Sequence, residues 1–246
     1  MLRLTESLTE AMFAFTNIVM LMAPLGVGAA LAFTVAQSGL GVMFNLGKLL
    51  LTLYVALLIF TLVGMLPAAL LARIPIRKFL RAVAEPATIA FATSTSEAAL
   101  PRAMEEMEAF GVPRKIVAFV IPTGYSFNLA GSALYLALAS IFTAQAAGIH
   151  MSLGKQVAML ATLMLTSKGV AGVPRAVLVV LLATSSIFGL PTEPILVILG
   201  VDALMDMGRT TINVVGNCLA SAVVARWEGE FQSETPSPEA VVALEG

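Results

Sequence analysis

The chain has 246 residues, of which 59% are hydrophobic and only 12% charged. This composition lies outside the range of soluble globular domains and places the chain among membrane proteins. A net charge of −1 gives no indication of nucleic-acid binding, and the single cysteine, Cys218, excludes an internal disulfide and a cysteine-based zinc site.

Two long apolar stretches open the chain, at residues 11–35 and 46–72, with a turn at 37–41 between them. Crossing a bilayer takes about 20 residues in a helix, so each stretch is long enough. A basic cluster follows the second stretch and consists of Arg73, Arg77, Lys78 and Arg81. The positive-inside rule predicts that this end is cytoplasmic.

The pattern of apolar and polar residues over 76–110 predicts a helical hairpin. Two helix-like segments, 76–92 and 98–110, flank the polar tip 93–97, and each is too short to cross a bilayer. Pro101 suits the first turn of the second segment. The arms are apolar where they approach the tip, which favours a re-entrant hairpin over a serine-rich soluble loop.

The next apolar stretch, 116–147, is predicted to be a broken span. Gly124, Asn128 and Gly131 weaken a continuous helix within residues 122–135. Unwound backbone at membrane depth occurs only where it is buried or lines a cavity, and its free carbonyls can bind a cation. His150, the only histidine, falls in the outer turn that follows, and we expect it to be solvated.

A second hairpin-like element covers residues 153–189, with a glycine- and proline-containing tip at 167–175. A tight outer turn at 189–194 precedes the last helix. From residue 229 the chain becomes polar and acidic, and we expect a disordered cytoplasmic tail. Two units of hairpin plus helix, entering from opposite faces, are typical of an inverted repeat with its binding site near the midplane.

The last helix, 200–227, carries a polar stripe formed by Asp202, Asp206, Arg209, Asn213 and Asn217. Steps of four, three, four and four residues keep these side chains on one face, since each helical residue turns about 100°. One charge at mid-bilayer costs roughly 2.5–3.5 kcal/mol, so the stripe should face protein or a cavity. It is either a structural network, with Arg209 paired to Asp206, or a binding site for a small ion carrying both charges. We favour the binding site.

Four motifs in order carry a family resemblance: STSEAALPR, IPTGYSFNLAGSALY, SKGVAGVP and DALMDMGRTTINVVGN. Together they resemble the glutamate/aspartate transporter family of dicarboxylate/amino acid:cation symporters, and most of all its bacterial proton-coupled members. The resemblance covers residues 8–231 and implies an all-α polytopic membrane protein. This would be the C-terminal core of the glutamate-transporter fold, with two re-entrant helical hairpins and broken helices, truncated N-terminally at the family's fifth helix.

The resemblance also implies an organisation and an activity. Residues 1–72 would be two transmembrane helices, 73–228 the transport core and 229–246 the tail. The protein would be a secondary active symporter of L-glutamate and L-aspartate in the bacterial cytoplasmic membrane, moving like an elevator within a homotrimer whose scaffold this chain mostly lacks. It would need no cofactor. A C4-dicarboxylate symporter and a truncated, non-transporting remnant remain the alternatives.

Carried over residue by residue, the resemblance implies a binding site. Arg209 would hold the substrate side-chain carboxylate through its planar fork, and Asp206 would bind the α-ammonium group. The implied substrate-binding residues are Ser96, Ser132, Val173, Asp206, Arg209, Thr210 and Asn213. The implied cation-binding residues are Gly124, Asn128, Asn213 and Asn217. Family dicarboxylate carriers have serine at the position of Asp206, which favours an amino-acid substrate.

Departures from the family pattern bear on ion coupling. Asn217 stands where sodium-coupled members have an aspartate, and Ala130 stands where the usual family motif has one. Val170 and Arg175 depart from the usual second tip. We therefore expect coupling to protons, with sodium less favoured. The candidate proton carriers are Asp202, Asp206 and Glu97, since a buried carboxyl group can hold a proton near neutral pH.

An intramembrane enzyme fits the sequence poorly. A serine protease needs a base beside its serine, but the only histidine is expected in an outer loop. An aspartyl protease needs two facing carboxylates, whereas Asp202 and Asp206 lie on one stripe of one helix. We therefore expect no enzymatic activity.

Overall fold

The computed structural model describes residues 25–26, 28–29, 32–33, 35–36, 39–166, 168 and 176–232, and its regular elements over this part are all helical. The helices are α2 (Gly41–Phe60), the π-helical turn η1 (Thr61–Met65), α3 (Leu66–Leu71), α4 (Ile76–Thr93), α5 (Ser96–Ala109), α6 (Arg114–Phe127), α7 (Ala130–Ala146), α8 (Leu153–Thr166), α9 (Ala176–Ile187) and α10 (Glu193–Trp227). The all-α class is confirmed. Most of the predicted first span and residues 233–246 of the predicted tail lie outside the described residues.

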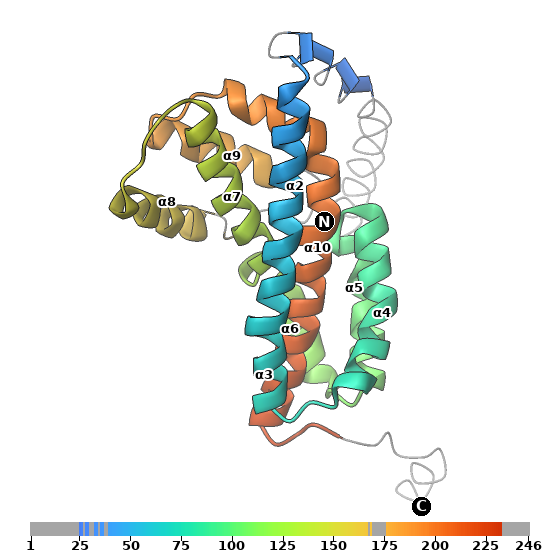
Figure 1. Cartoon of the computed structure of the whole chain (residues 1–246). Helices are drawn as coiled ribbons and strands as arrows, with labels where there is room; N and C mark the ends of the chain where they lie inside the picture. Colours follow the sequence, from blue (N-terminus) through green and yellow to red (C-terminus); the bar gives the residue numbers. More distant parts are fainter. Residues whose placement is uncertain are drawn as a thin grey trace, which may run out of the picture.

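The long helix α10 runs beside α2 and α6 (Figure 1) and contributes residues to two hydrophobic cores. The first core packs α4, α5 and α6 against the C-terminal half of α10 and includes Phe79, Met107, Ile121 and Leu219. The second packs α2, α7, α8 and α9 against its N-terminal half and includes Leu53, Leu136, Leu163 and Ile198. Each hairpin-plus-helix unit thus has its own core, and the polar stripe of α10 lies where the two cores meet.

The second predicted span is one long helical segment, Gly41–Leu71, with a π-helical turn that the sequence did not indicate. Pro67 lies just after this turn and has no N–H to bond the carbonyl of Val63, which explains the local change of helix type. The segment runs beside α10 (Figure 1). A Cβ added at Gly208 of α10 would lie 3.0 Å from the Tyr54 ring, so the two helices approach closely there.

The helices α4 and α5 form a packed antiparallel pair, with bounds within two residues of those predicted. The chain reverses at Ser94, which adopts the left-handed conformation (φ 54°). The side chain of Thr95 then accepts a hydrogen bond from the Ala98 N–H (3.3 Å) and caps α5. Because this cap starts α5 two residues earlier than predicted, Pro101 lies inside the helix and not in its first turn.

The basic cluster and the start of the tail, which we predicted to be cytoplasmic, both lie near the C-terminal end of α10. The Arg226 guanidinium donates to the Arg73 carbonyl (3.3 Å), and Glu230 of the tail pairs with the Lys115 ammonium (2.7 Å). At the other end, residues from the start of α2, the end of α7 and the start of α10 surround one pocket. The predicted sidedness of these segments relative to one another is therefore consistent with the fold.

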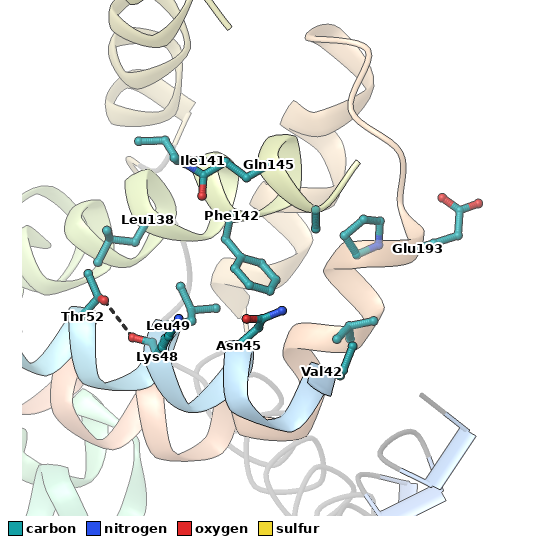
Figure 2. Close-up of a pocket in the computed structure, with 13 residues that line it drawn as sticks. Val42, Asn45, Lys48, Leu49, Thr52, Leu138, Ile141, Phe142, Gln145 and Glu193 are labelled. Carbon is teal, nitrogen blue, oxygen red and sulfur yellow. Dashed lines mark hydrogen bonds between the residues drawn. The ribbon is translucent and has the colours of Figure 1, made fainter. Parts of the chain in front are cut away.

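That pocket has a volume of about 730 Å³ and is lined by residues that include Asn45, Lys48, Phe142, Gln145 and Glu193 (Figure 2). None of the predicted substrate- or cation-binding residues lines it. The predicted site lies elsewhere, along the middle of α10.

Candidate functional site

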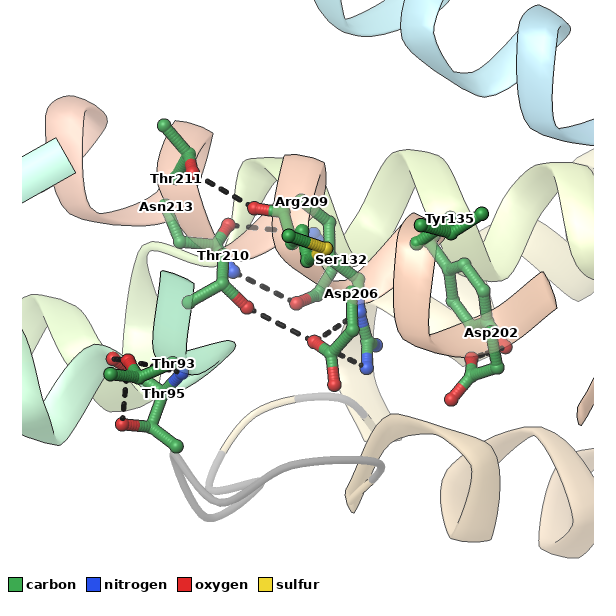
Figure 3. A network of polar contacts seen from close by, with 12 residues as sticks. Thr93, Thr95, Ser132, Tyr135, Asp202, Asp206, Arg209, Thr210, Thr211 and Asn213 are labelled. Atoms are coloured by element: carbon green, nitrogen blue, oxygen red, sulfur yellow. Dashed lines mark hydrogen bonds and ion pairs between the residues drawn. The ribbon is translucent and has the colours of Figure 1, made fainter. Parts of the chain in front are cut away.

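The polar stripe of α10 is buried, as its cost in lipid predicts. Its five side chains are at most 3% exposed: Asp202, Asp206, Arg209, Asn213 and Asn217. Figure 3 shows four of them, Asp202, Asp206, Arg209 and Asn213, beside Ser132 and Tyr135 of α7. Asn217 lies against Gly124 of α6. The stripe therefore faces the interior of the protein.

The centre of the site is an ion pair within α10. The Nε and Nη2 atoms of Arg209 lie 2.9 and 2.8 Å from Oδ1 of Asp206, and the Thr210 hydroxyl donates to the same oxygen (3.0 Å). The third nitrogen of the guanidinium, Nη1, is buried without a hydrogen-bond partner among the described residues. An unpaired N–H pair on a buried cation is costly and is suited to bind an anionic oxygen.

Tyr135 of α7 supports this ion pair, although the sequence analysis gave it no role. Its ring centroid lies 4.5 Å from the Arg209 guanidinium carbon, and its hydroxyl donates to Oδ1 of Asp202 (2.7 Å). Tyr135 follows Ser132 by three residues, so the two share a face of α7. That spacing was the signal that could have revealed it. Through Tyr135, Asp202 and Arg209 belong to one buried network.

The predicted break in the helix is confirmed between α6 and α7, at Asn128 and Leu129. Asn213 bonds to the start of α7. Its Oδ1 accepts from the backbone N–H groups of Gly131 (2.8 Å) and Ser132 (3.4 Å), and its Nδ2 donates to the Ser132 hydroxyl (2.9 Å). In an unbroken helix these two backbone N–H groups would donate to carbonyls of the preceding turn. The oxygen of Asn213 is thus bonded to α7 in this structure.

Close approach of α7 and α10 depends on Gly131. A Cβ added at this residue would lie 2.3 Å from the Arg209 carbonyl oxygen, closer than real Cβ contacts occur. The glycine allows the backbone of the broken helix to reach the backbone of α10 beside the ion pair.

Gly124 and Asn217, two predicted cation-binding residues, are adjacent. A Cβ at Gly124 would lie 2.3 Å from Oδ1 of Asn217. Both polar atoms of the Asn217 amide are buried without a hydrogen-bond partner among the described residues, as is the Tyr125 hydroxyl. Asn128 is partly buried, and its backbone N–H donates to the Gly124 carbonyl (2.7 Å). The structure thus leaves a buried amide oxygen available next to the end of α6.

The hairpin tips are only partly described. Ser96 is buried (5% exposed) in the first turn of α5, and Figure 3 shows Thr93 and Thr95 of the same tip near the α10 network. Val173, predicted to contact substrate, lies outside the described residues, as do Val170 and Arg175. His150 is exposed, as expected. No group of three histidine, cysteine or acidic side chains that could hold a metal ion occurs within the described ranges.

Comparison with known proteins identifies the class. A family model described as the sodium:dicarboxylate symporter family matches residues 1–227. The chain belongs to this family. Multi-pass membrane architecture and a transporter class follow from membership, and the enzyme hypotheses are thereby excluded. The helical segments Gly41–Leu71 and Arg114–Ala146 are long and apolar enough to cross a membrane.

Curated relatives fall into two groups by name. The chain is 47% identical over 226 residues to a proton/sodium-glutamate symport protein of Bacillus subtilis (strain 168), covering 92% of this chain and 53% of the relative. It is 46% identical to a proton/glutamate-aspartate symporter of Escherichia coli (strain K12), covering 92% and 52%. It is 43% identical to a C4-dicarboxylate transport protein 2 of Polaromonas naphthalenivorans, covering 93% and 51%. The chain thus spans about half the length of these relatives, and their names do not decide its substrate.

Proposed function

We propose that the α10 site binds an acidic amino acid, L-glutamate or L-aspartate, and that the chain takes part in its proton-coupled symport across the bacterial cytoplasmic membrane. The observation that carries the proposal is the buried Arg209. Its guanidinium pairs with the Asp206 carboxylate through Nε and Nη2, while Nη1 has no hydrogen-bond partner among the described residues. This arrangement presents one cationic and one anionic group within a single buried site.

An amino acid with an acidic side chain matches both groups. Its side-chain carboxylate would bind the free edge of the Arg209 guanidinium, where charge-assisted hydrogen bonds are strong. Its α-ammonium group would bind Asp206, with Thr210 beside it. Ser132 and Asn213 would line the same site from the start of α7, and Ser96 and Val173 would close it from the hairpin tips.

A C4-dicarboxylate substrate is the second candidate. Relatives named for C4-dicarboxylate transport match this chain nearly as well as those named for glutamate. In addition, Asp206 already accepts hydrogen bonds from Arg209 and Thr210, so a ligand without an ammonium group does not leave this carboxylate uncompensated. The presence of Asp206 itself favours the amino acid, because only an ammonium group gains from a carboxylate at that position.

Replacement of Asp206 separates the two candidates. Asp206→Asn keeps the shape of the side chain and removes the charge that would bind the ammonium group. Losing one partner of a buried charge pair costs about 2–5 kcal/mol, so L-aspartate affinity should fall roughly 30-fold or more while succinate binding is kept or strengthened. Binding to the purified chain can be measured by calorimetry. Thr211→Val is a matched control, because among the described residues the Thr211 hydroxyl bonds only the Met207 carbonyl, within α10. Equal loss of both ligands, or of neither, would contradict the assignment.

We propose proton coupling because the groups that could bind a sodium ion include no carboxylate. Gly124, Asn128 and Asn217 offer carbonyl and amide oxygens without the two carboxylates most frequent at the family's cation sites, and Asn213 is already bonded to α7. Asp202 and Asp206 are buried and Glu97 is half-buried, and these three remain the proposed proton carriers.

A transport assay tests the coupling. The chain, or the longer protein that contains it, is reconstituted in proteoliposomes, and uptake of labelled L-glutamate is followed under a sodium gradient at fixed pH and under a pH gradient without sodium. Uptake driven by the pH gradient supports the proposal, and uptake driven by sodium alone would refute it. Within this proposal residues 73–228 form the moving core, with both hairpins re-entrant, and residues 1–72 form membrane helices beside it. The family's elevator movement and trimer would require the scaffold half.

A further inference from the structure

The break between α6 and α7 leaves carbonyls at the end of α6 without their helical partners, and the Phe127 carbonyl is one of them. In a continuous helix the Phe127 carbonyl would accept a hydrogen bond from the N–H of Gly131. Here that N–H donates to Asn213 instead (2.8 Å). The Phe127 carbonyl therefore points out of the C-terminal end of α6, where the helix dipole places partial negative charge.

A lysine from the second hairpin occupies this end. The ammonium nitrogen of Lys168 lies 2.6 Å from the Phe127 carbonyl oxygen. Lys168 follows the end of α8 at Thr166, whereas Phe127 is 41 residues earlier in the chain. The contact thus brings a fixed positive charge from one hairpin to the broken helix, next to the residues proposed for substrate and cation binding.

Carbonyl oxygens at the C-terminal ends of broken helices are the groups that bind alkali cations in transporters. An ammonium group carries the same charge as such an ion and donates up to three hydrogen bonds to the same oxygens. An ion from solution must be bound and released, whereas the Lys168 charge is tethered to the chain and cannot be exchanged.

We propose that Lys168 is a tethered cation that takes the place of an inorganic cation at the C-terminal end of α6, and so makes this end of the broken helix independent of sodium. The ammonium group offsets the partial negative charge of the Phe127 carbonyl oxygen and repels a second cation from it. The tethered charge would remove one sodium-dependent step from coupled transport, and this consequence rests on the proposed function. The test below measures ion binding and not transport, so the tethered-cation proposal and the proposed transport function can fail separately.

The test is a thermal-shift series on the purified full chain. Wild type, Lys168→Met and Lys168→Arg are melted in detergent at increasing NaCl, with total salt held constant by choline chloride. Methionine keeps the unbranched stem and removes the charge, whereas arginine keeps the charge. Lys155→Met is the matched control, because Lys155 is an exposed lysine of α8 whose ammonium bonds no described residue.

Lys168→Met should gain sodium-specific stabilisation, with a Tm rise of about 2 °C or more at about 100 mM sodium, because an ion that binds only the folded state stabilises it. Wild type, Lys168→Arg and Lys155→Met should show no such rise. A Lys168→Met protein whose Tm does not respond to sodium, or a wild type that responds equally, would overturn the proposal and leave Lys168 as an ordinary helix cap.

Chemical rescue provides a second measurement if Lys168→Met does not fold. Lys168→Cys is prepared in a chain whose buried Cys218 has been replaced by serine. Reaction with an aminoethyl thiosulfonate restores an ammonium group, and reaction with a methyl thiosulfonate does not. Sodium should raise the Tm only of the protein that carries the uncharged methyl disulfide. An equal sodium response of both adducts would refute the tethered-cation role.

Discussion

Substituting Gly131 by alanine tests how closely the broken helix must approach α10. The added Cβ would lie 2.3 Å from the Arg209 carbonyl oxygen, and the helical backbone at that oxygen cannot turn aside as a flexible side chain could. The start of α7 must therefore move away from α10. The same movement stretches the hydrogen bond from the Gly131 N–H to Asn213, which is 2.8 Å long in the structure.

The loss of stability on the Gly131→Ala substitution can be worked out from these two contacts. Overpacking of a well-packed core costs about 1–3 kcal/mol. A buried hydrogen bond that is lost with its groups left unpaired costs about 1–3 kcal/mol more. The sum is about 2–6 kcal/mol, and at about 2–4 °C per kcal/mol for a chain of this size the Tm should fall by at least roughly 4 °C. L-Aspartate affinity should fall as well, because the displaced start of α7 carries Ser132, which bonds Asn213 and belongs to the proposed site.

The assay is thermal unfolding of the purified chain with and without L-aspartate. Gly216→Ala is the matched control, because it lies in α10 and its added Cβ would meet only Asn128 Nδ2 at 3.9 Å, an ordinary contact. Alanine is a better helix former than glycine by about 1 kcal/mol, so the control should be unchanged or slightly more stable. A Gly131→Ala protein as stable as its control, with unchanged L-aspartate affinity, would refute the close-approach argument.

Three further predictions concern the network and the topology. Arg209→Ala removes the cation from the buried Asp206–Arg209 pair, so stability should fall by about 3–5 kcal/mol and acidic amino-acid binding should be lost, with calorimetry as the measurement. Tyr135→Phe removes the hydroxyl that donates to Asp202 (2.7 Å) and should lower stability by about 1–3 kcal/mol in a denaturant titration, while the ring still stacks on the guanidinium. In a chain without its native cysteine, impermeant thiol reagent added outside whole cells should label a cysteine at Ile149 and not one at Arg77; the reverse pattern would invert the topology.

The polar stripe and the helix breaks could be predicted from the sequence. Charged and amide residues in a membrane helix must avoid lipid, and their helical spacing places them on one face, so the burial of Asp206 and Arg209 followed from local physics. The breaks near Ser94 and Asn128 followed from polar residues, glycines and short apolar arms. In each case the signal lies within one turn or one span of the chain.

The partners of the stripe were decided only by the tertiary structure. Tyr135 stacks on Arg209, and Asn213 bonds to the start of α7, across 74 and 82 residues of chain respectively. The contact between Lys168 and the Phe127 carbonyl likewise depends on how the second hairpin packs. The spacing of Ser132 and Tyr135 could indicate that Tyr135 faces the site, but no local pattern indicates which group it meets there. Such contacts arise when two hydrophobic cores pack on opposite halves of α10 and bring polar groups together. Sequence therefore determined which side chains had to be buried, and packing of the two cores determined which groups they meet.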